Sequence, residues 1–208
     1  MNFNSSKFLY FLLGIYAVLF TVLSINPVDR QTWLVENLTV WIIIAAILIL
    51  YALKVRFSKT AYALMFVLIY LHTIGGHYTF AEVPFDWFTD FFGFSRNHFD
   101  RIAHFTVGFY AFAVAEWIAV KKLVSSKFLL FTYPIFLIAA IAMTYELVEW
   151  VYALQAPAED AMNYLGSQGD IWDAQKDMLA DTLGAIAATC LFFLMKRKSG
   201  LLPSKPKI

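Results

Sequence analysis

The sequence predicts an all-α integral membrane protein, a six-helix bundle with both termini in the cytoplasm. The first observation is composition: the 208 residues are 61% hydrophobic, 18% aromatic and only 15% charged. A soluble domain is usually about 45–50% apolar. The second observation is the distribution of basic residues along the chain. Together they predict the membrane environment and the orientation within it.

Six apolar runs approach or reach the length needed to cross a bilayer, for which about 20 residues suffice. They lie near residues 8–25, 38–53, 61–78, 102–120, 128–150 and 178–195. The first run follows Lys7 as in a signal peptide, but SINPVDR lacks a small-x-small cleavage site, so we expect a retained helix. Because no repeat or linker is visible, we expect a single transmembrane domain over residues 1–208.

Basic residues gather in four segments that alternate with the predicted helices and contain no Asp or Glu. The positive-inside rule therefore places these segments, and both termini, in the cytoplasm. The basic tail marks the end of the last helix, and we expect no nucleic-acid partner because the chain shows no suitable fold or patch. The four segments hold twelve of the 16 basic residues: Lys7; Lys54, Arg56 and Lys59; Lys121, Lys122 and Lys127; Lys196, Arg197, Lys198, Lys205 and Lys207.

The opposite face receives most of the acids and histidines, in three groups. The segment TYELVEW contributes Glu146 and Glu149, which share a helix face because they are three residues apart. The segment RNHFDRIAHF contributes Arg96, His98, Asp100, Arg101 and His104 at the start of the fourth helix. The segment GDIWDAQKDMLAD contributes Asp170, Asp173, Asp177 and Asp181, which form one stripe if the segment is helical.

Ionisable groups inside membrane spans indicate a functional site by default. Imidazole and carboxylate groups together suit zinc, manganese or iron, so we predict a divalent-metal site. Its candidate ligands are His98, His104, Glu146, Asp173 and Asp177. The candidate catalytic residues are Asp100, His104, Glu146, Glu149, Asp173 and Asp177. Arg96 and Arg101 are candidates for substrate binding.

Structural roles are the alternative for each group. Asp170 and Asp173 can cap the last helix, and Arg96, Asp100 and Arg101 can fix the loop geometry. Other polar and aromatic residues also have structural interpretations. We expect His72 and His77 to be satisfied by neighbouring helices, Glu116 to extend to the cytoplasmic interface, and the aromatic residues from Trp87 to Phe94 to form an interfacial belt or short amphipathic segment.

Three long motifs carry a family resemblance. FGFSRNHFDRIAHFTVGF, YELVEW and GSQGDIWDAQKDMLADTLGA closely resemble the bacterial YjdF-type inner membrane proteins, over nearly the whole chain. This resemblance implies a bacterial inner-membrane location but no reaction. More loosely, the chain is similar to VanZ-like membrane proteins. The matching positions there are Asp100, Arg101, His104, Glu146 and Asp177 or Asp181, while Glu149 and the expanded acidic segment depart from that pattern.

Two classes of function follow from these residues. In the first, a metal ion activates water for hydrolysis of a lipid-linked or envelope substrate. In the second, the chain is a small transporter, binding protein or structural protein whose polar residues form a network that joins helices. Both classes place the protein in contact with the lipid bilayer.

The orientation gives the first testable prediction. Reporter domains fused to either terminus are expected to give a cytoplasmic signal, because the basic segments flank both ends of the helical region. Paired alkaline phosphatase and green fluorescent protein fusions measure this. Phosphatase activity from either terminal fusion would contradict the orientation.

Overall fold

The computed structural model describes residues 3–155, 161, 165 and 167–203, and its regular secondary structure is helical throughout this part. Six helices in the described part are long and apolar enough to cross a membrane. The all-α prediction with six spans is therefore confirmed. The spans are Ser5–Leu23, Arg30–Ala52, Lys59–His77, Phe99–Lys121, Lys127–Ala153 and Asp173–Lys196.

The fourth span consists of two helices, because the regular α-helical hydrogen bonding is interrupted at Gly108 and Phe109, where backbone N–H groups bond three residues back. A short helix, α4, precedes it in the polar segment. In chain order the elements are α1 (Phe3–Leu23), α2 (Arg30–Ala52), α3 (Lys59–His77), α4 (Asp86–Phe92), α5 (Phe99–Val107), α6 (Tyr110–Lys121), α7 (Lys127–Ala153) and α9 (Asp173–Lys196).

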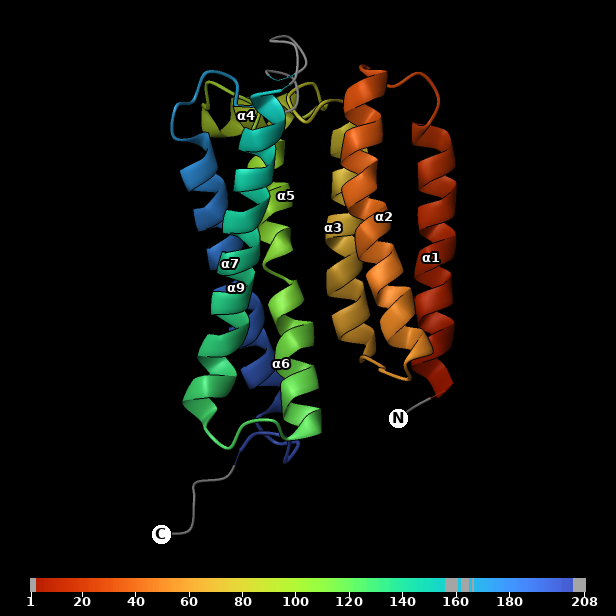
Figure 1. The fold of residues 1–208 in the computed structure, drawn as a ribbon, viewed down its shortest axis with the longest axis vertical. Helices are drawn as coiled ribbons and strands as arrows, with labels where there is room; N and C mark the ends of the chain where they lie inside the picture. The colour runs from red at the N-terminus through yellow and green to blue at the C-terminus, as the bar shows by residue number, and fades with distance from the viewer. Residues whose placement is uncertain (1–2, 156–160, 162–164, 166, 204–208) are drawn as a thin grey trace.

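Helices α1 to α3 stand on one side of the molecule and α5, α6, α7 and α9 on the other (Figure 1). Helix α3 joins the two groups, since it contacts α1 and α2 as well as α5 and α6. Helix α9 contacts α5, α6 and α7. The shared core is apolar, and its fully buried members include Leu9, Tyr62, Phe66, Phe112, Leu130 and Phe192.

The start of α1 and the end of α9 lie at the same end of the bundle, which we call the basic end (Figure 1). At the opposite end, the acidic end, α9 begins and α4 lies across the spanning helices (Figure 1). Helix α4 exposes 67% of Trp87 and 78% of Phe91. Such exposed aromatic side chains suit the interface between a membrane and water, as the sequence indicates.

Several helices begin earlier than the apolar runs predict, and two of them bear on the site. Helix α2 begins at Arg30, and α9 begins at Asp173. Polar residues at both helix starts lower the local hydropathy without preventing helix formation. At α2, the side chain of Asp29 accepts a hydrogen bond from the backbone N–H of Thr32 at 2.6 Å, which caps the helix and lowers the pKa of Asp29. As a result, Glu36 lies inside α2 and is only 2% exposed.

The prediction that the Glu116 side chain extends to the cytoplasmic interface is wrong. Its side chain is buried inside the bundle, where it accepts a hydrogen bond from the backbone N–H of Ser58 at 2.6 Å. Lys196 Nζ lies 3.8 Å from the same carboxylate. Glu116 therefore links the N-terminus of α3 to α6 and α9. The backbone N–H groups at the start of a helix have no partner within the helix, so they attract a carboxylate.

Helices α5 and α9 make a close backbone contact through two glycines. A Cβ atom added to Gly184 would overlap the carbonyl of Phe105, and one added to Gly108 would overlap the α9 backbone from Asp181 to Ala185. Small residues allow helix axes to approach closely in membranes. This contact holds the end of α5 against the middle of α9.

The glycine contact predicts the effect of a single methyl group. Gly184→Ala is expected to destabilise the protein by about 1–3 kcal/mol, because backbone atoms rather than a flexible side chain must move. The thermal unfolding midpoint in detergent measures the effect. Gly14→Ala in α1 is the matched control, since a Cβ there has open space. Equal midpoints for the two variants would contradict the contact.

Candidate functional site

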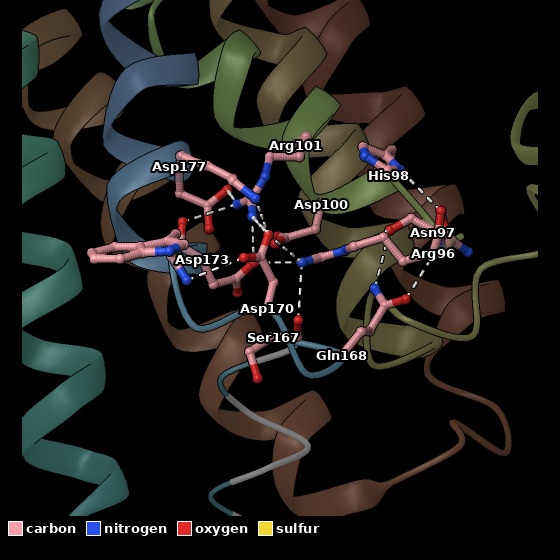
Figure 2. A network of polar contacts seen from close by, with 12 residues as sticks. Arg96, Asn97, His98, Asp100, Arg101, Ser167, Gln168, Asp170, Asp173 and Asp177 are labelled. Atoms are coloured by element: carbon pink, nitrogen blue, oxygen red, sulfur yellow. Dashed lines mark hydrogen bonds and ion pairs between the residues drawn. The ribbon is translucent and has the colours of Figure 1, made fainter. Parts of the chain in front are cut away.

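Two arginines bind the aspartates at the start of α9 (Figure 2). Arg96 donates to Asp173 Oδ1 at 2.6 Å and to the backbone carbonyl of Ser167 at 2.9 Å. Arg101, in the first turn of α5, contacts the carboxylates of both Asp173 and Asp177. The arginines therefore neutralise the outer part of the aspartate stripe.

Lys176 completes this group of charges. Its Nζ atom donates to Asp170 Oδ2 at 2.6 Å, and this hydrogen bond lowers the pKa of Asp170. We define the cap network as three cations and three carboxylates in contact: Arg96, Arg101 and Lys176 with Asp170, Asp173 and Asp177. The charges of the cap network balance.

Loop contacts hold the cap network in place. The backbone N–H of Asn97 donates to Gln168 Oε1 at 3.0 Å, and Gln168 Nε2 donates back to the Asn97 carbonyl at 3.0 Å (Figure 2). The Asn97 side chain also donates to the carbonyl of Val83 at 2.7 Å. The segments before α5 and α9 are thus joined directly.

His104 lies one turn deeper than Arg101 and faces three aspartates. Its Nε2 atom is 3.6 Å from Asp100 Oδ1 and 3.7 Å from Asp177 Oδ1. Its Nδ1 atom is 3.3 Å from Asp181 Oδ2. Potential ligand atoms of Asp100, His104 and Asp177 all lie within 4.8 Å of one another. These three residues can therefore hold one metal ion.

A cavity of about 190 Å³ opens beside this triad. The triad and Asp181 line one part of it, and α2, α3 and α7 contribute Glu36, His72 and Glu149. Glu36 Oε2 lies 2.9 Å from His72 Nε2. The rest of the lining is largely apolar and includes Ile43, Leu68, Phe80, Val107, Ile141 and Leu165. The cavity therefore combines a carboxylate-rich part with an aliphatic part.

The structure places the predicted ligands in four different settings. Asp173 belongs to the cap network, and His98 hydrogen-bonds the Arg96 carbonyl at 2.9 Å with its ring against Phe94. Figure 2 shows the His98 ring pointing away from the carboxylates. Glu146 forms no hydrogen bond or ion pair with the described residues, and its Oε1 atom is buried. The geometry thus joins His104 and Asp177 with Asp100, while His98 and Glu146 lie outside this group.

Sequence reasoning missed two lining residues, Glu36 and His72. The expected satisfaction of His77 by a neighbouring helix is confirmed by its contact with the Leu23 carbonyl at 2.7 Å. His72 Nε2 lies 2.9 Å from Glu36 Oε2 on α2, but neither atom makes a hydrogen bond with the described residues. The available signal was the capping motif at Asp29. Starting α2 there places Glu36 two turns inside the helix, where an acid needs a partner.

The fold and the site define a class of protein, a helical membrane protein with a capped acidic cavity at one end of its bundle. The chain belongs to the family described as predicted membrane protein (DUF2238), whose model matches residues 8–198. It is 35% identical to the inner membrane protein YjdF of Escherichia coli (strain K12) over 174 residues, which are 83% of this chain and 81% of that protein. No solved structure matches the chain.

The cap network predicts the consequence of removing one cation. Arg101→Met is expected to destabilise the protein by about 3–5 kcal/mol, because Asp177 and Asp173 then keep buried charge with less compensation. Unfolding in detergent measures this, and adding Asp177→Asn should restore part of the loss.

Lys176→Met is the matched control. The Lys176 side chain is 52% exposed, so its pairing with Asp170 contributes about 1 kcal/mol or less. If the arginine and lysine variants lose the same stability, the arginine does not compensate buried charge.

Proposed function

We propose that the chain is a bacterial inner-membrane enzyme that binds a divalent metal ion through Asp100, His104 and Asp177. The ion would activate water for hydrolysis of a lipid-linked or envelope substrate. The relative named as an inner membrane protein supports the location. The basic segments support cytoplasmic termini, which put the acidic end and its cavity on the external side.

The observation that carries the proposal is the orientation of His104. Metal-binding histidines usually donate their second ring nitrogen to a carboxylate, which fixes the tautomer and aims the other nitrogen at the metal. Asp181 Oδ2 lies 3.3 Å from His104 Nδ1, and Nε2 faces Asp100 and Asp177. Asp181 thus occupies the position of an orienting carboxylate, with 1% of its surface exposed.

The number of ligands fits a catalytic site better than a structural one. Structural metal sites are usually closed by four protein ligands, whereas catalytic sites keep a position for water or substrate. The described residues supply three grouped ligands beside a cavity. Glu149 lines this cavity from α7. It is therefore the candidate to accept a proton from the attacking water.

Arg96 and Arg101 hold the ligand Asp177 and its neighbour Asp173 in place. Their proposed role in substrate binding requires a negatively charged group on the substrate to share these contacts. Such sharing is possible because a guanidinium carries five N–H donors. The two arginines would then meet substrate at the mouth of the site rather than at the metal.

A second candidate follows from the ion pair of Arg101 with Asp177. Because Asp177 Oδ1 faces both Arg101 and His104, this carboxylate already has a positive partner without a metal ion. In that case the polar residues join α5 and α9, and the chain acts as a small transporter, binding protein or structural protein. The two candidates differ in metal content.

Elemental analysis of purified protein tests the proposal. We expect about one divalent ion per chain after purification with zinc, manganese or iron supplied, and loss of the ion in His104→Ala and Asp177→Asn. Asp181→Asn should retain the site but weaken the affinity by about 10–100-fold. Glu116→Gln is the control, because it alters a buried acid at the basic end.

A parent protein without metal after this purification would leave the arginine-paired network as the better account. Hydrolysis needs its own measurement. Metal-loaded protein incubated with radiolabelled envelope lipids should release a labelled product, and His104→Ala should not. A metal-containing protein with no product in this assay would favour binding or transport.

A further inference from the structure

The lining of the cavity changes from polar to apolar along the bundle axis. Each of α2, α3, α5 and α7 contributes a polar residue nearer the acidic end and an aliphatic residue nearer the middle of the bundle (Figure 1). On α2 and α7 the two residues are seven and eight positions apart, which corresponds to about 10–12 Å along a helix. A ligand that fills the cavity therefore needs a polar end and an apolar end. In the order of the helices, the pairs are Glu36 and Ile43, His72 and Leu68, His104 and Val107, and Glu149 and Ile141.

The apolar end of the cavity reaches the outer surface of the bundle at α7. Ile141 lines the cavity, and yet 50% of this residue is exposed. It lies beside the midpoint of α7 (Lys127–Ala153), which is one of the six membrane spans. Hydrocarbon rather than water surrounds a span at this depth. The cavity thus meets the lipid at its apolar end.

Helices α2 and α7 flank this opening without closing it. Helix α2 packs against α3, and α7 packs against α6 and α9, but α2 and α7 share no extensive contact within the described chain. Both helices present apolar side chains to the outside, since Ile42 is 61% exposed and Leu147 is 52% exposed. The described helices therefore leave a lateral path between α2 and α7 that joins the cavity to the bilayer.

We propose that the ligand of this cavity is a membrane lipid, whose hydrocarbon chain fills the apolar end and leaves between α2 and α7. The polar part of the lipid then lies beside Asp100, His104 and Asp177, so the inference rests on the proposed function for the reaction itself. A lipid in the leaflet at the acidic end has the same orientation, because its head lies outward and its chain points to the bilayer centre.

The size and lining of the cavity fit a lipid better than a water-soluble envelope molecule. The volume of about 190 Å³ is smaller than the 300–1,000 Å³ that is usual for about one drug-sized ligand. A lipid needs only part of its length inside, because the rest of its chain stays in the bilayer. A soluble molecule would bring polar groups against Ile43, Leu68 and Val107, where they lose hydrogen bonds to water without replacement.

Photolabelling of the purified full-length protein in phosphatidylethanolamine and phosphatidylglycerol vesicles tests the proposal. The probe is a trace of phosphatidylglycerol with a diazirine in its acyl chain, and mass spectrometry maps the adducts. We expect adducts at the lining residues Leu68 and Val107 as well as at outward residues such as Ile42. Leu68 is only 4% exposed, so lipid that surrounds the bundle does not reach it.

A second probe identifies the source of the hydrocarbon chain. Polyprenyl phosphate with a diazirine on its chain presents an isoprenoid in place of an acyl group. An adduct at Leu68 with one probe assigns the cavity to that kind of chain, and adducts with both probes show that either chain enters. Absence of the Leu68 adduct with both probes would overturn the proposal.

Two neighbouring residues of α2 provide a matched pair of variants. Ile43→Trp is expected to abolish the Leu68 adduct, because the larger side chain fills the apolar end of the cavity. Ile42→Trp makes the same change on the exposed face of α2 and should label like the parent. Parent-like labelling of Leu68 in both variants would contradict the lateral path.

The labelling is carried out on chelator-treated protein, so it requires neither a metal ion nor hydrolysis. Leu68 adducts in a protein that elemental analysis finds free of metal would refute the metal-dependent reaction and retain the lipid path. Bound metal with adducts confined to outward-facing residues would do the reverse. Both outcomes use the parent protein alone, so they stay informative if a variant fails to fold.

Discussion

The structure depends on neutralising three aspartates that α9 buries along one face. Asp173, Asp177 and Asp181 are 8%, 3% and 1% exposed, so each deeper residue has less access to water. An uncompensated charge in such a place costs several kcal/mol. Helix α5 supplies the compensating groups from one of its faces. Arg101 and His104 share that face because they are three residues apart, and Asp177 and Asp181 share a face of α9 because they are four residues apart. Arg101 contacts Asp177, and His104 contacts Asp181. The register of α5 against α9 follows from this match.

Close approach of the backbones makes the match possible. Gly108 and Gly184 let α5 and α9 meet without intervening side chains, and the α5 to α6 break lies at the same level. Helix α3 packs against α5, and α2 packs against α3. The cavity then forms where Glu36 and His72 face the aspartate stripe. A local packing contact thus decides which polar groups share one space.

Features that repeat within one helix could be predicted from the sequence, as could the meeting of His104 with Asp177, but most other contacts between helices could not. The spacing of Asp170, Asp173, Asp177 and Asp181 predicts a stripe, and the structure shows one for the last three, while Asp170 precedes α9 and lies outside the helix. His98 looked equivalent to His104 in the sequence, but it precedes the first turn of α5, where its side chain turns to the Arg96 carbonyl. Likewise, pairing Glu36 with His72 required knowing that α2 and α3 are neighbours, which hydropathy does not reveal.

The distribution of basic residues explains why the cavity remains acidic. Twelve of the 16 lysines and arginines lie in the basic segments, and three of the other four are Arg96, Arg101 and Lys176. All three act in the cap network. Nearly every cation at the acidic end is therefore used at the mouth of the site, and the carboxylates deeper in the bundle depend on histidines, protons or a bound cation. The cations of the chain are therefore divided between the basic segments and the mouth of the site, which leaves the deeper part of the cavity without lysine or arginine among its described lining residues.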